Sequence, residues 1–85
     1  MLDKIKQLES SLSFHQEKQL KSILGKEIYD LFDELIDSET EDSAREKMIV
    51  FVSAAKKSPH RMLLAQKILS EEQSDIIMDL ADEVD

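Results

Sequence analysis

The chain has 85 residues, which is enough for one compact domain but too short for two with separate cores. It contains no cysteine, one glycine and one proline, and this excludes disulfides, thiol chemistry, a glycine-rich phosphate loop and a turn-rich β fold. Its net charge of −8 opposes direct binding of nucleic acid across the surface as a whole.

Apolar residues recur at helical spacing along the whole chain, in segments that polar capping residues separate. The sequence predicts helices over residues 2–12, from Ser13 to about Gly25, over 26–37, over 44–57, over 59–69, and from Ser70 onward. The side chains that we expect to face inward include Leu2, Ile5, Leu8, Phe14, Leu20, Ile28, Phe32, Leu35, Met48, Phe51, Met62, Leu64, Ala65, Ile76 and Leu80. The fold class is therefore all-α, a small irregular four- or five-helix bundle in which residues 1–85 form a single helical domain.

Helix-start signals are clearest at Ser13 and Ser70, each of which has a glutamine three residues later in capping-box position. Ser58-Pro59 and Ser43 are further expected starts. The two Leu-Ser-x-x-Gln segments look alike, and a shared capping signal explains this better than an internal duplication. Gly25 leaves two alternatives open: it ends a helix, or it lies inside one longer helix.

The predicted helix over 44–57 is apolar on nearly all sides, and its run from Met48 to Val52 is far too short to span a membrane. Such a helix is either central in a monomer or shared between two subunits, so a homodimer stays open. The first residues lack the apolar core of a signal peptide, and we expect a cytoplasmic protein.

Charge falls in alternating blocks: residues 27–46 carry −8, residues 47–70 carry +5, and residues 71–85 carry −7. On the wheel of the 26–37 helix the acidic residues lie opposite the apolar face, and the last helix repeats this arrangement. Like charges three or four positions apart destabilise a helix slightly, so helix stability does not account for these acidic rows. They are either solvated faces offset by the basic block or binding surfaces for a cationic partner.

Four apolar residues are left on polar faces once the core is assigned: Ile49, Val50, Leu63 and Met78. Single exposed apolar residues are ordinary, whereas several that converge indicate an interface.

No catalytic, cofactor or metal site is predicted. His15 and His60 are far apart and form no ligand motif. The acidic loop from Asp37 has Asp42 and Met48 where a calcium loop needs glycine and glutamate, and the many carboxylates lie on exposed faces. A helix-turn-helix over 44–69 would place its positive charges beside two strongly acidic blocks.

These observations favour a small acidic interaction module, such as an adaptor, an assembly factor or an inhibitor, that binds a protein with a basic surface and is not an enzyme. The alternative is a nucleic-acid-mimicking inhibitor of a DNA- or RNA-binding protein, with a phage or mobile-element source as one option. The predicted partner-binding residues are Glu27, Asp30, Asp33, Glu34, Asp37, Leu63, Asp75, Met78, Asp79 and Asp82.

Overall fold

A computed structural model describes all 85 residues and contains five α-helices and no strand. The helices are α1 (Leu2–Ser11), α2 (Phe14–Ile36), α3 (Glu41–Lys56), α4 (Pro59–Ile68) and α5 (Glu71–Val84). The predicted fold class, a small all-α bundle, is confirmed. None of these helices is both long and apolar enough to cross a membrane.

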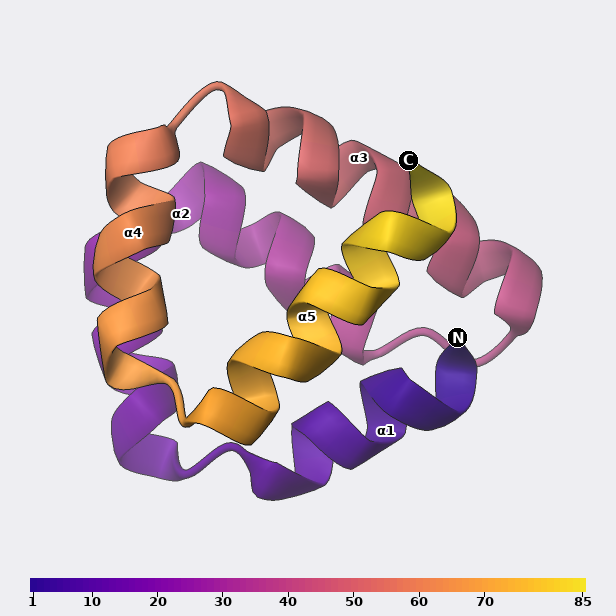
Figure 1. Cartoon of the computed structure of the whole chain (residues 1–85), viewed down its shortest axis with the longest axis horizontal. Coiled ribbons are helices and arrows are strands. Elements are labelled where there is room, and N and C mark those ends of the chain that lie inside the picture. Colours follow the sequence, from indigo (N-terminus) through magenta and orange to yellow (C-terminus); the bar gives the residue numbers. More distant parts are fainter.

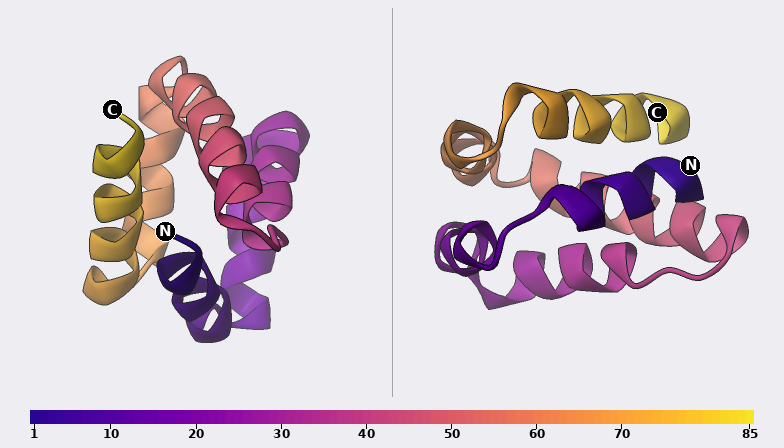
Figure 2. Two further views of the ribbon diagram at one scale, coloured as in Figure 1. Left: turned by 90° about the vertical axis from the view of Figure 1, so that its right-hand side faces the viewer. Right: turned by 90° about the horizontal axis from the view of Figure 1, so that it is seen from below.

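The helices form a stack with α2 at the back and α4 and α5 at the front (Figure 1). Figure 2 shows that α4 lies over the first half of α2, while α1 and α3 fill the space between α5 and the second half of α2. Accordingly, α4 packs mainly on α2, whereas α5 packs on α3 and α1. The two consecutive helices α4 and α5 hardly contact one another.

One cluster of 14 buried apolar residues forms the core and takes residues from every helix. The rings of Phe32 and Phe51 join α2 to α3 at a centroid distance of 5.6 Å. Met48 and Phe51 are both buried, so α3 is a central helix of this chain, whereas its Ile49 and Val50 remain about half exposed.

Two residues predicted to face inward do not. Phe14 is 73% exposed, because a helical step of about 100° per residue places it roughly 120° from Leu20, and Lys18 Nζ covers its ring at 5.1 Å instead. Leu64 is 37% exposed, because α4 packs mainly on α2 and α3 and part of its surface stays uncovered.

The start of α3 also differs from the prediction. Thr40, and not Ser43, is the N-cap: its hydroxyl accepts a hydrogen bond from the Ser43 N–H at 3.1 Å. Glu41 then lies in the first turn, where a carboxylate suits the helix dipole, and it accepts a bond from the Leu2 N–H at 2.8 Å. This contact across the fold ties the start of α3 to α1.

Gly25 breaks α2 into two helical halves. Its φ of 81° and ψ of 164° lie in a region that residues other than glycine rarely adopt. Of the two alternatives that the sequence left open, a helix end at Gly25 is therefore correct, and an uninterrupted helix is not. Arg61 Nη1 donates a 2.7 Å hydrogen bond to the Leu24 carbonyl that the break leaves free. The break thus both bends α2 and provides the point where α4 is fastened to it.

We predict that Gly25→Ala lowers the free energy of unfolding by about 1–3 kcal/mol. A β-carbon there would also lie 2.6 Å from Arg61 Nη1. Urea denaturation measures the change, and Lys26→Ala, at the exposed neighbouring position, is the control that we expect to stay within about 0.5 kcal/mol of the parent. An equal effect of the two substitutions would contradict the left-handed backbone at Gly25.

The two predicted capping boxes, at Ser13 and Ser70, are both present and they interlock. The Gln16 Nε2 donates to Gln73 Oε1 at 2.8 Å, and the Gln73 Nε2 donates to Gln16 Oε1 at 3.2 Å. Each amide also donates to a main-chain carbonyl of the other corner, Gln16 to Ile68 at 3.1 Å and Gln73 to Ser11 at 2.9 Å. The α1–α2 corner and the α4–α5 corner are therefore fastened to each other.

We expect Gln73→Ala to lower the free energy of unfolding by about 2 kcal/mol or more, because the buried Gln73 amide serves several main-chain and side-chain groups at once. Gln7→Ala is the matched control, since that amide makes one exposed bond to Glu72 and its loss should change stability by about 0.5 kcal/mol at most. Chemical denaturation of both variants checks this, and a small effect of Gln73→Ala would show that the corners are not held by the glutamines.

Candidate functional site

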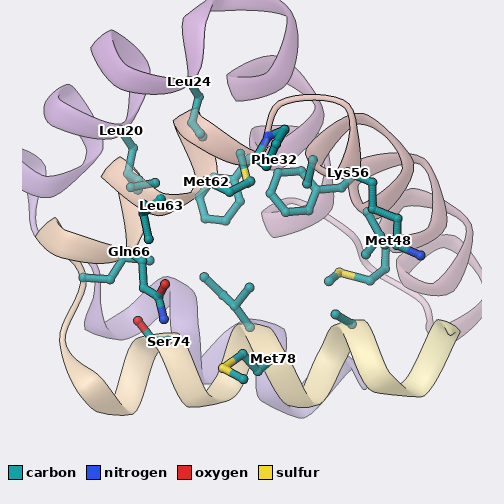
Figure 3. A pocket seen from close by; sticks show the side chains of 18 of the residues that line it. Leu20, Leu24, Phe32, Met48, Lys56, Met62, Leu63, Gln66, Ser74 and Met78 are labelled. Carbon is teal, nitrogen blue, oxygen red and sulfur yellow. The ribbon is translucent and has the colours of Figure 1, made fainter.

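The most apolar hollow of the surface is a groove of about 520 Å³ that has α5 on one side and α3 and α4 on the other. It exists because α4 and α5 leave their shared two-residue corner in different directions, α4 toward α2 and α5 toward α3 and α1. Leu20, Leu24 and Phe32 of α2 also line the groove, and so do Met48 and Lys56 of α3 (Figure 3).

The lining is almost entirely hydrophobic. Its polar members are Lys56, Gln66, Ser74 and Asp85. Gln66 and Ser74 point toward each other at one end of the groove (Figure 3). At the other end the Lys56 Nζ lies 2.9 Å from Asp85 Oδ1, which joins α3 to the end of α5. No buried side-chain nitrogen or oxygen in the chain lacks a hydrogen-bond partner, so no orphaned polar group is aimed into this space.

Leu63 and Met78, two of the four apolar residues that the sequence leaves on polar faces, both line this groove. They come from α4 and α5 respectively and are 56% and 58% exposed. Their convergence is what distinguishes a candidate interface from scattered apolar residues. Met48 and Met62 also line the groove, so three of the four methionines of the chain gather there.

The other two residues of that group, Ile49 and Val50, line a second hollow between α2 and α3. That hollow shares no residue with the groove and is less apolar, because Glu27, Lys57 and Arg61 also line it. The four residues thus divide into two pairs on two different surfaces.

All eight acidic residues predicted to bind a partner are exposed. Five of them belong to α2 and its C-cap and form no ion pair and no side-chain hydrogen bond within the chain; they are Glu27, Asp30, Asp33, Glu34 and Asp37. None of the five lines the groove.

The acidic residues of α5 differ in whether they have a partner within the chain, which the helical wheel did not reveal. On the side of α1, Lys4 Nζ lies 3.8 Å from Asp79 and Gln7 donates to Glu72. Asp75 and Asp82 have no partner within the chain, and they flank Met78 at three and four positions. Asp75 and Asp82 are thus unpaired beside the groove-lining Met78, whereas Asp79 has a partner in α1.

Glu41 and Tyr29 have displaced pKa values but lie outside the groove. The hydrogen bond from the Leu2 main-chain N–H lowers the pKa of Glu41, with a further contribution from the nearby amino terminus. Burial raises the pKa of the Tyr29 hydroxyl, and the charges of Glu17 and Asp33 act in the same direction. No three histidine or acidic side chains are placed so that they could hold a metal ion.

No protein-family model, no curated protein and no solved structure matches this chain. The fold defines a small all-α protein with one open apolar groove, and its function must be inferred from that surface.

Proposed function

We propose that this protein is a small protein-binding module, acting as an adaptor, assembly factor or inhibitor, and that it holds an apolar segment of its partner in the groove between α4 and α5. The observation that supports this most directly is the convergence of the exposed Leu63 and Met78 on one apolar groove. Binding hot spots need apolar area that becomes fully desolvated, and this groove provides it.

The lining favours a protein segment over a small molecule. Small-molecule sites usually combine an apolar cavity with a few inward-pointing polar groups that fix the orientation of the ligand. Here Gln66, Ser74, Lys56 and Asp85 lie at the two ends, and the walls between them are hydrophobic. An apolar face of another protein needs no such groups, because its orientation is fixed along the whole contact.

A nucleic-acid-mimicking inhibitor is the second candidate function, and the unpaired acidic row of α2 favours it. Glu27, Asp30, Glu34 and Asp37 follow one another at spacings of three and four, so their carboxylates are surface neighbours. This function predicts competition with DNA for a nucleic-acid-binding partner. The competition should weaken steeply with salt and be lost on reversing the charges of Asp30, Asp33 and Glu34; indifference to both would exclude the mimic.

A homodimer and a cytoplasmic location belong to the same proposal. The exposed Ile49 and Val50 of the central helix α3 are the surface through which two copies would meet. Sedimentation or light scattering at micromolar concentration distinguishes a monomer from a dimer.

To test the groove, the protein is used for affinity purification from its native host, followed by binding measurements with each purified partner. We expect Leu63→Asn combined with Met78→Gln to lower the affinity for the partner at least about tenfold. The control is Phe14→Ser, which alters an even more exposed apolar residue outside the groove. Because all three side chains are exposed, we expect each substitution to change the free energy of unfolding by about 0.5 kcal/mol at most, in the groove variant and in the control alike. A partner that binds the groove variant as tightly as the parent would refute the proposed site.

A further inference from the structure

We infer that the groove binds an amphipathic α-helix whose apolar face fills it and whose lysine or arginine flank lies along α5. This inference rests on the protein-binding function proposed above and specifies the chemistry of the partner. It follows from the different charges on the two sides of the groove.

The α5 side of the groove is anionic. Glu71, Asp75, Met78, Asp82 and Asp85 follow one another at spacings of four and three, so they form one line along the helix. Met78 and Asp85 line the groove, which places this line at its edge. Glu71, Asp75 and Asp82 are exposed and form neither an ion pair nor a side-chain hydrogen bond within the chain. Their charges are therefore free to pair with cations of a bound partner.

The opposite side, which α4 and α3 form, contributes no acidic residue to the lining, and α4 itself contains none. His60, Leu63 and Lys67 form a corresponding line there at spacings of three and four, and Leu63 lines the groove. A partner helix with cations on one flank only would meet opposite charge along α5 and avoid repulsion from Lys67. The two edges thus fix how such a helix is turned about its own axis.

The shape and the lining suit a helix of moderate length. The anionic line follows all of α5, whose 14 residues extend about 21 Å, so a partner helix of about four turns matches it. Apolar anchors at spacings of three and four would contact the apolar lining, and the flexible thioether side chains of its methionines, Met48, Met62 and Met78, adapt to anchors of different shapes.

The probe for this inference is a synthetic helix of about 14 residues, the length of α5, with leucine on one face and lysine on the other; a matched peptide has glutamate at every lysine position. The protein is labelled with ¹³C at the methionine methyl groups. We expect the lysine peptide to shift the signals of Met48, Met62 and Met78 and to leave Met1, which lies outside the groove, unchanged. The glutamate peptide should bind at least about tenfold more weakly.

Two triple variants separate a specific edge from general charge attraction. The first variant combines Glu71→Lys, Asp75→Lys and Asp82→Lys. It should lower the affinity for the lysine peptide at least about tenfold and raise the affinity for the glutamate peptide. Asp30→Lys, Asp33→Lys and Glu34→Lys change the net charge of the protein by the same amount but lie outside the groove. We expect this control to change the affinity by less than about threefold.

Several results would overturn the inference: equal affinity for the two peptides, equal effects of the two triple variants, or methionine signals that the lysine peptide leaves unmoved. Tighter binding of dodecanoate at the same methionines would indicate a small-molecule site. Shifts of these signals on dilution without peptide would indicate a second copy. If a native partner depends on Leu63 and Met78 while the lysine peptide does not bind, the cationic helix is refuted and the protein-binding function stands.

Discussion

Two glutamine side chains determine where the helices of this protein diverge. The Gln16 and Gln73 amides bond to each other, and each also bonds within its own helix start and to the opposite corner. Because the α1–α2 and α4–α5 corners share these partly buried bonds, neither corner can shift without breaking hydrogen bonds of the other. From this junction α4 follows α2 while α5 follows α1 and α3, and the groove is the space between them.

The break at Gly25 supports the same arrangement from the other side. Arg61 fastens α4 to the Leu24 carbonyl, so α4 is held against α2 and away from α5. At its far end the groove is bounded by the pair of Lys56 and Asp85, which joins α5 to α3. The groove is thus a consequence of how the surrounding helices are anchored, and it places Leu63 and Met78 on its two sides.

The helices and most of the core could be predicted from the sequence, because capping and helical periodicity are local properties. Ser13, Pro59 and Ser70 each mark a helix start that the structure contains, and the wheel identified Leu63 and Met78 as exposed. The groove could not be predicted, because it depends on the angle between α4 and α5, which the bond between Gln16 and Gln73, 57 positions apart, helps to fix. For the same reason the wheel placed Asp79 in one row with Asp75 and Asp82, although packing of α1 gives Asp79 a partner in Lys4. The sequence also could not show that three methionines lie around one groove, because they come from three different helices.

The central claim is that α4 and α5 stand apart in the free protein and leave an apolar groove open to solvent. Nuclear Overhauser contacts between methyl groups test this most directly. Met62 should contact the α2 side chains that line the groove, and Leu63 should not contact Met78. A strong contact between Leu63 and Met78 in the free protein would mean that α4 closes on α5, and it would contradict the account.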